Sequence, residues 1–223
     1  MGETSSGVIF DVDGTLVDTN YLHTVAWARS VRDAGESAPM ASIHRLMGMG
    51  SDQLVEDLLG HANEAVADGH TRHFKGLMEE IQAFPGSTEL LEEVHRRGAK
   101  VVLATSASQD QLAAMLAALD VPEGVIDHMT NKDDVEQSKP APDIFRAAME
   151  GSGLDCERAL VVGDTIWDIR AAASCGLRVV GVLTGGTTRR DLEDEGAIAV
   201  YEDPADLLAH LDDSPLNEVF PPA

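Results

Sequence analysis

Four short polar segments of this chain carry side chains that could do chemistry. They are Asp11-Val12-Asp13-Gly14-Thr15, Thr105-Ser106, Lys139-Pro140 and Gly163-Asp164-Thr165-Ile166-Trp167-Asp168. Singly, each segment has an ordinary structural interpretation, such as an acidic turn, a helix N-cap or a surface lysine. Together they supply four carboxylates, one lysine and several hydroxyl groups. Such a set suits the binding of a divalent cation.

The carboxylates can share one site only if something offsets their repulsion. They belong to Asp11, Asp13, Asp164 and Asp168. Each close pair of like charges costs roughly 4 kcal/mol at an intermediate effective dielectric. A bound cation would offset that cost, and oxygen ligands without a histidine or cysteine cluster favour Mg²⁺ over zinc. Because Mg²⁺ usually combines one or two carboxylates with substrate phosphate, the set indicates a phosphorylated substrate.

The polar segments lie at the ends of predicted strands and helices, which alternate along the chain. The sequence predicts strands over residues 6–11, 100–104, 125–129, 159–163, 178–183 and 198–201. It predicts helices over residues 88–97, 110–119, 143–150, 168–175 and 204–210. This alternation favours an α/β fold with a parallel sheet covered on both faces, and ligands then bind at the carboxyl ends of the strands. The four polar segments are therefore expected to converge on one edge of the sheet.

A long helical stretch interrupts this alternation directly after the first strand. Residues 18–83 show helical periodicity without a strand pattern, and Pro85 and Gly86 break that periodicity at its end. We therefore predict an inserted all-helical cap domain over residues 18–83. The catalytic core would comprise residues 1–17 and 84–223.

Composition narrows the class of partner. The chain has 223 residues, with 16 Lys and Arg against 39 Asp and Glu, so its formal net charge is −23. That field repels nucleic acids and anionic membrane surfaces, so we expect neither as a partner. The two cysteines show no metal-ligand spacing, and the first residues show no secretory signal. These features predict a cytoplasmic protein.

The four segments, in this order, resemble the motifs of the haloacid dehalogenase-like hydrolase superfamily. The first is Asp11-Val12-Asp13-Gly14-Thr15-Leu16, the second is Thr105, and the fourth is Gly163 to Asp168. The third is Lys139-Pro140-Ala141-Pro142-Asp143-Ile144-Phe145. The resemblance covers nearly the whole chain, including the helical insertion. It implies a Rossmann-like core, Mg²⁺ dependence and an aspartyl-phosphate intermediate.

The resemblance assigns roles to the first motif. Asp11 would be the nucleophile, and Asp13 would protonate the leaving oxygen and later deprotonate water. Gly14 would allow a sharp turn that leaves backbone amides near Asp13 free for phosphate oxygens. Gly14 and Thr15 are accordingly expected to bind substrate.

The remaining motifs would complete the site. Thr105 would bind the transferring phosphoryl group, with Ser106 beside it as a further substrate-binding residue. Lys139 would neutralise the nucleophile and the phosphate. Asp164 would ligate Mg²⁺, supported by Asp168. The full set of predicted metal ligands is Asp11, Asp13, Asp164 and Asp168.

The start of the predicted cap bears on the subfamily. Asp13 argues against the dehalogenases and the phosphonate-cleaving members, which lack this second aspartate. Asp18-Thr19-Asn20-Tyr21-Leu22-His23 resembles beta-phosphoglucomutase and its phosphatase relatives, in which a histidine at this place couples cap closure to acid-base chemistry. A half-buried helix histidine explains His23 equally well. We interpret the other cap histidines, His44, His61, His70 and His73, as surface residues.

Two enzyme classes and one non-catalytic class fit these residues. The favoured function is a Mg²⁺-dependent phosphatase for a small phosphorylated metabolite, such as a sugar phosphate or phosphoglycolate, acting as a monomer or homodimer. The alternative is a hexose-phosphate mutase, which needs basic cap residues for a second phosphate. Methionine, glycine and serine surround Gly48 instead, although Arg45, Arg72 and Lys75 could substitute. A binding module that kept the fold is disfavoured because no motif residue is missing.

Overall fold

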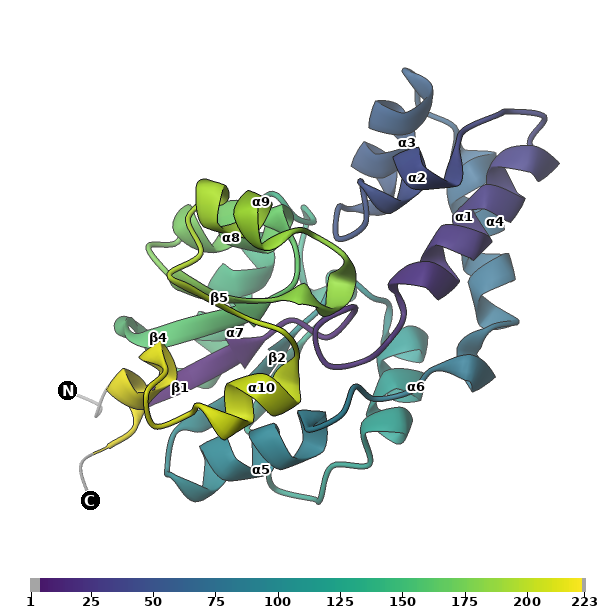
Figure 1. Cartoon of the computed structure of the whole chain (residues 1–223). Helices are drawn as coiled ribbons and strands as arrows, with labels where there is room; N and C mark the ends of the chain where they lie inside the picture. The colour runs from purple at the N-terminus through teal and green to yellow at the C-terminus, as the bar shows by residue number, and fades with distance from the viewer. Residues whose placement is uncertain (1–4, 222–223) are drawn as a thin grey trace.

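The central element of the structure, a computed structural model that describes residues 5–221, is a six-stranded parallel sheet. Its strand order is β3-β2-β1-β4-β5-β6, and Figure 1 labels four of these strands, β2, β1, β4 and β5. The strands are β1 Ser5–Phe10, β2 Lys100–Ala104, β3 His128–Thr130, β4 Leu154–Gly163, β5 Arg178–Val182 and β6 Ala199–Tyr201. The predicted parallel sheet is confirmed. The chain therefore has the Rossmann-like α/β fold.

Alternate strand residues pack into two separate hydrophobic layers. In β1, Val8 and Phe10 join one buried cluster and Ile9 joins the other. Successive side chains of a strand point to opposite faces, so a sheet covered on both sides needs apolar residues at every position. This is why the inner strands read as continuous apolar runs.

The helices of the core cover both faces of the sheet. They are α5 Ser87–Arg96, α6 Gln109–Leu119, α7 Asp143–Ser152, α8 Ile166–Ala173, α9 Arg189–Glu195 and α10 Pro204–Ala209. Residues of α5, α6 and α10 join the cluster that contains Phe10, whereas residues of α7, α8 and α9 join the cluster that contains Ile9.

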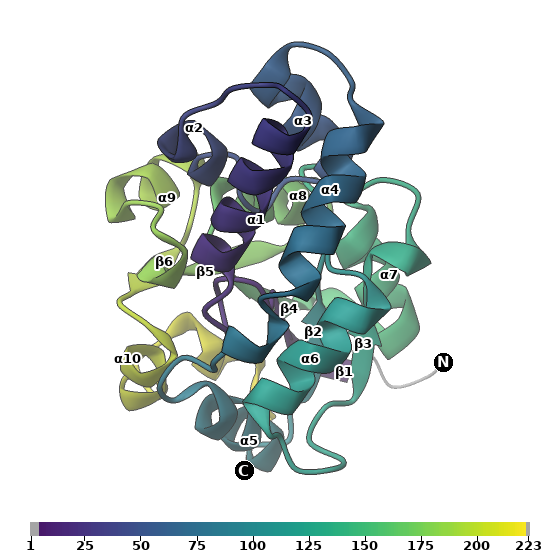
Figure 2. The same cartoon turned by 90° about the vertical axis from the view of Figure 1, so that its right-hand side faces the viewer.

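The helical stretch that follows β1 has a small core of its own. Its helices are α1 Asn20–Asp33, α2 Met40–His44, α3 Ser51–Leu59 and α4 Glu64–Lys75. Their shared buried cluster includes Trp27, Ile43, Leu54 and Val66. Both views show these helices standing beside the carboxyl end of the sheet rather than against either face (Figures 1 and 2). We call α1–α4 the cap helices.

Two neighbouring chain segments join the cap helices to the sheet. The Asp18 amide donates to the Gln82 carbonyl at 2.8 Å, and the Phe84 amide donates to the Leu16 carbonyl at 2.9 Å. We propose the division expected from the sequence, with residues 18–83 as the cap domain, because the chain enters and leaves the cap helices at this one place.

The helices and strands depart from the predicted bounds where the local sequence is polar. β4 begins at Leu154 rather than 159, because Leu154 pairs with Ser5, and the register then shifts before Ala159 pairs with Gly7. The helix α9 was not predicted, because Leu192 is its only buried residue and shows no periodicity. α8 begins at Ile166 rather than 168, because Thr165 and Asp168 form a capping box.

Within the described residues, no helix combines the length and the apolar composition that crossing a bilayer requires. Residues 1–4, where the sequence shows no secretory signal, lie outside the part of the chain that the structure describes.

Candidate active site

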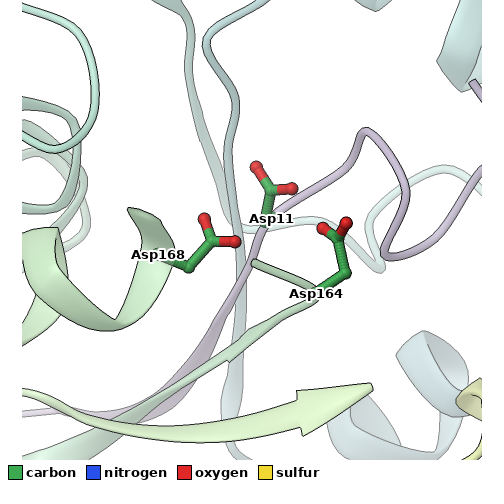
Figure 3. Close-up of side chains that lie close together, drawn as sticks. All are labelled: Asp11, Asp164 and Asp168. Carbon is green, nitrogen blue, oxygen red and sulfur yellow. The ribbon is translucent and has the colours of Figure 1, made fainter. Parts of the chain in front are cut away.

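Three aspartates from separate elements meet at the carboxyl end of the sheet. Asp11 follows β1, Asp164 follows β4, and Asp168 lies in the first turn of α8. One carboxylate oxygen of each lies within 4.8 Å of the others, and all three residues are buried. Figure 3 shows the three side chains pointing toward a common space. We call Asp11, Asp164 and Asp168, together with Lys139, the carboxylate cluster.

Lys139 is the cation of this cluster and is itself buried. Its Nζ pairs with Asp11 Oδ1 and lies 2.7 Å from Asp168 Oδ1. Burial alone would lower the pKa of Lys139, but attraction to Asp11 and Asp168 outweighs it and raises the pKa above the ordinary value. Lys139 is therefore charged, and it leaves two of the three negative charges without a cation.

That excess of negative charge appears in the pKa values of the carboxyl groups. Burial raises the pKa of Asp11 well above its usual value, opposed by Lys139 and reinforced by Asp168 and Asp164. Burial, followed by repulsion from Asp168, raises the pKa of Asp164 to about 7. These carboxylates are therefore costly to ionise unless another cation joins them.

The small size of Gly14 allows the Asp164 side chain to lie directly against the turn after β1. Gly14 has a φ of 76°, and a Cβ there would lie 2.3 Å from Asn20 Nδ2 and 2.6 Å from Asp164 Oδ2. Asn20 Nδ2 donates to Asp164 Oδ2 at 2.9 Å, and Thr15 Oγ1 donates to Asp164 Oδ1 at 2.9 Å. Glycine is required here for both its conformation and its size.

Asp13 lies two residues beyond Asp11 but faces another set of partners. Thr19 donates to Asp13 Oδ1 at 2.8 Å, Thr105 donates to Oδ2 at 2.9 Å, and His23 Nε2 lies 3.1 Å from Oδ1. Burial would raise the pKa of Asp13, but the hydrogen bonds and the attraction of His23 outweigh it and lower that pKa. Asp13 is therefore an ionised carboxylate with a histidine beside it.

His23 is one of four aromatic rings that stack on one another between α1 and α4. His23 and Trp27 of α1 stack on Phe74 and His70 of α4, with centroid distances of 3.8 Å for His23 and Phe74 and 4.0 Å for Trp27 and His70. His23 Nδ1 and His70 Nε2 lie 3.0 Å apart. We call these four residues the ring cluster. Through His23 and His70, it connects Asp13 to the helix α4 of the cap.

A small cavity lies between the cap helices and the core, beside Asp13. Its volume is about 80 Å³. Cap residues on its wall include Trp27, Met47, Met49 and Leu54, and core residues include Ser106, Ala107 and Lys132. The Gly50 amide donates to the Lys139 carbonyl at 3.0 Å, so the cap loop directly contacts the segment that carries the lysine. This cavity is the space into which a substrate of the site would fit.

Residues 6–176 match the haloacid dehalogenase-like hydrolase family. The chain belongs to this family. It is 32% identical over 205 residues to the phosphorylated carbohydrates phosphatase of Thermotoga maritima, covering 87% of this chain and 93% of that protein. It is 29% identical over 215 residues to phosphoglycolate phosphatase of Rhodospirillum rubrum, covering 90% of this chain and 88% of that protein. The structure is similar to that of a hydrolase from Pseudomonas syringae, with a TM-score of 0.88, 37% identity, and coverage of 94% of this chain and 99% of that one.

In this haloacid dehalogenase-like hydrolase, the predicted metal ligands divide between two places. Asp11, Asp164 and Asp168 form the carboxylate cluster, but the Asp13 carboxylate is not part of it. Both Asp13 oxygens instead accept hydrogen bonds from hydroxyl groups. The Asp13 carboxylate therefore lies outside the group of oxygens that could hold a metal ion together.

The predicted substrate-binding residues also differ in their contacts. The Thr15 hydroxyl donates to Asp164 and lies 3.4 Å from Asp11 Oδ2, so it holds the carboxylates. Ser106 Oγ is a buried atom without a hydrogen-bond partner among the described residues, and Ser106 lines the cavity. Ser106 is therefore a candidate for a contact with a substrate oxygen.

Three residues of the site were not found from the sequence, and one of them had been misread. Thr19 and Asn20 are buried and hydrogen-bond to the aspartates, yet nothing in their spacing marks them. The interpretation of His70 as a surface residue is wrong, since only 6% of it is exposed. A signal existed: His70 and Phe74 repeat the four-residue spacing of His23 and Trp27, which places each pair on one helix face.

The carboxylate cluster fits Mg²⁺ on its donor chemistry. Its ligand atoms are carboxylate oxygens, which suit a hard cation. Three carboxylates face one lysine, so a divalent ion would balance the remaining charge. Asp11, Asp164 and Asp168 are the side chains that would hold it.

Proposed function

We propose that the chain is a Mg²⁺-dependent phosphatase that hydrolyses a small phosphorylated metabolite through an aspartyl-phosphate intermediate. The observation that carries this proposal is the position of Asp11, which lies between Lys139 and Asp164 at the end of β1. Membership of a hydrolase family and the phosphatase names of its relatives support a phosphoric monoester hydrolase.

The first step is attack by an Asp11 carboxylate oxygen on phosphorus. The new bond joins Asp11 to phosphorus, the ester P–O bond breaks, and Asp13 protonates the departing oxygen. Lys139, which pairs with Asp11, reduces repulsion between the carboxylate and the phosphate. The metal, when bound, would supply further charge neutralisation to the phosphoryl group.

The second step reverses the role of Asp13. As a carboxylate, Asp13 takes a proton from water, whose oxygen attacks the aspartyl phosphate and releases inorganic phosphate and free Asp11. Because the pKa of Asp13 is lowered, its proton in the first step must be shared with a neighbouring base. His23 Nε2, 3.1 Å from Asp13 Oδ1, is in place for this.

The cavity favours a small ester. Its volume of about 80 Å³ is well below the roughly 300–1,000 Å³ of pockets for drug-sized ligands. A sugar phosphate or a phosphoglycolate-like substrate is consistent with the names of the relatives. Larger sugars would require the cap helices to move away from the core.

The wall of the cavity disfavours the mutase alternative. Arg45, Arg72 and Lys75 are exposed and do not line the cavity. Among the described residues that line the cavity, the basic one, apart from histidines, is Lys132, and it belongs to the core. The lack of a cap lysine or arginine on this wall disfavours a second phosphate site in the cap.

Phosphate release across a metabolite panel tests the proposal. We expect turnover of phosphoglycolate or of a small sugar phosphate with millimolar Mg²⁺ and its loss with a chelator. Equal turnover in the chelator would contradict the metal requirement. Phosphorus NMR of beta-glucose 1-phosphate primed with the bisphosphate distinguishes the mutase, which would accumulate glucose 6-phosphate faster than free phosphate.

A further inference from the structure

We propose that His70 is a positioning residue for proton transfer, whose neutral imidazole accepts the Nδ1–H of His23 and so fixes the tautomer and ring orientation with which His23 faces Asp13. The inference deepens the proposed function and rests on it, because it takes Asp13 as the acid of the first step. It concerns the cap helices, where no motif residue of the core lies.

The geometry is a continuous row of three polar groups. Asp13 Oδ1 lies 3.1 Å from His23 Nε2, and His23 Nδ1 lies 3.0 Å from His70 Nε2. Both distances suit hydrogen bonds. Each ring nitrogen of His23 thus has one partner. Nε2 faces Asp13 and Nδ1 faces His70, and an acceptor at His70 keeps a proton on Nδ1.

The rings are held by stacking rather than by further hydrogen bonds. His70 is sandwiched into the ring cluster against Trp27, and His23 lies nearly parallel to Phe74, with an interplanar angle of 3°. The two helices approach closely because position 69 is glycine. A Cβ on Gly69 would lie 2.1 Å from Ser30 Oγ, which itself donates to the Val66 carbonyl at 2.5 Å.

His70 is an acceptor because its surroundings keep it neutral. Burial lowers its pKa well below the usual value, and electrostatic interactions with His23, Lys132 and His73 act in the same direction. A neutral imidazole protonated on Nδ1 presents a lone pair at Nε2. His23 can then donate from Nδ1 throughout.

The consequence is a defined place for the mobile proton. With Nδ1 of His23 protonated, any further proton lies between His23 Nε2 and Asp13 Oδ1, which is where the leaving oxygen needs it. Asp13 delivers that proton, and His70 itself gains and loses none. Without His70, His23 could also protonate at Nε2 alone or rotate away from Asp13.

Two variants at position 70 separate the hydrogen bond from packing. His70→Phe keeps a ring against Trp27 but removes both nitrogens, whereas His70→Gln keeps an acceptor near the position of Nε2. His61→Phe is the control, because His61 is an exposed cap histidine that pairs with Glu36 outside the site. Circular dichroism and thermal melting establish that each variant is folded.

The kinetic readout is the dependence on the leaving group. For an alkyl phosphate, whose leaving oxygen needs a proton, we expect His70→Phe to lower kcat by about 10- to 100-fold with little change in KM, a fraction of what a general acid contributes. For p-nitrophenyl phosphate we expect less than about a threefold loss, and His70→Gln should recover part of the alkyl rate. Equal losses on both esters, or no recovery in His70→Gln, would overturn the proposal.

A second measurement does not depend on turnover. Nitrogen NMR of the ligand-free protein should show His23 protonated at Nδ1 in the parent and in His70→Gln, with that preference lost in His70→Phe. If the tautomer of His23 is the same in all three, the proposal for His70 fails. If the parent hydrolyses no phosphate ester, the proposed function fails, and the NMR result still decides the role of His70.

Discussion

The carboxylate cluster and the ring cluster meet at one site but are built by different physical means. The carboxylate cluster gathers charges at the ends of β1 and β4 and the start of α8, and Lys139 holds two of its three aspartates. The ring cluster gathers four aromatic side chains between α1 and α4, where stacking and burial dominate. In the proposed reaction, the core would supply charge and the cap helices would hold the proton beside Asp13.

The comparison shows how the proposed reaction could depend on cap position. The sheet sets the distances within the carboxylate cluster whether or not the cap moves. His23, by contrast, lies on the cap helix α1 and contacts Asp13 at 3.1 Å, so this contact depends on where the cap lies. Nucleophilic attack and proton transfer therefore rest on different parts of the molecule, and mutations can separate them.

The largest effect is expected at Asp11. Asp11→Asn removes the nucleophile, so kcat should fall by more than about a thousandfold. The fold should persist, because Lys139 keeps Asp168 as a partner. Phosphate release and circular dichroism measure the two effects, and Asp57→Asn, at an exposed cap position, is the control. Activity above about one per cent of the parent would exclude Asp11 as the nucleophile.

Asp13→Asn should stop the reaction at a later point. Attack by Asp11 needs no proton from Asp13 when the leaving group is good, but hydrolysis of the phosphoenzyme needs a base. Intact-mass analysis after mixing with an activated phosphate donor should show the mass of one added phosphoryl group. Phosphate release at the parental rate would remove Asp13 from the mechanism.

The carboxylate cluster should make the metal-free protein less stable as pH rises. Asp164 has a pKa of about 7 in the folded protein against an ordinary value of 3.8, so the folded state binds the proton more tightly than the unfolded state. The contribution of the Asp164 proton to the free energy of unfolding is complete below about pH 4 and is lost as pH rises through 7.

Thermal melting of Asp164→Asn against the parent measures this contribution. Without metal, the two proteins should melt together below about pH 4, the melting temperature of the parent should fall progressively behind as pH rises, and the variant should melt at least about 4 °C higher at pH 8, since each kcal/mol shifts the melting temperature by roughly 2–4 °C. His70, whose lowered pKa acts in the opposite direction, is present in both and cancels. Mg²⁺ should raise the melting temperature of the parent alone. A constant difference across pH would contradict the assignment.

The smallest effect is expected where the ring cluster depends on helix spacing. In Gly69→Ala the new Cβ must either turn the Ser30 hydroxyl away from the Val66 carbonyl or push α4 away from Ser30, which should cost about 1–3 kcal/mol and reduce turnover only a few-fold. Gly76→Ala is the matched control, since a Cβ there meets nothing closer than 3.5 Å. If Gly69→Ala lowers stability but leaves kcat for alkyl esters at the parental value, the helix spacing does not matter for proton transfer.

The sequence by itself determined the sheet and the place of the charged residues. Apolar runs such as residues 100–104 predict buried strands, and parallel strands bring their carboxyl ends to one edge. The meeting of Asp11, Asp164 and Lys139 follows from that rule and from the spacing of the motifs. β3 was predicted less accurately than β1, over residues 125–129 rather than His128–Thr130, because a short edge strand carries a weaker apolar pattern.

Only the tertiary structure decided which side chains complete the site. Local patterns place His23 and His70 on helix faces, but the sequence does not say which two helix faces meet, because that depends on the packing of α1 against α4 around Gly69. The side-chain direction of Asp13, away from Asp11 and toward Thr105, likewise depends on hydrogen bonds from elements far apart in the chain. Strand ends converge by a general rule, whereas helix contacts depend on the close fit of particular side chains.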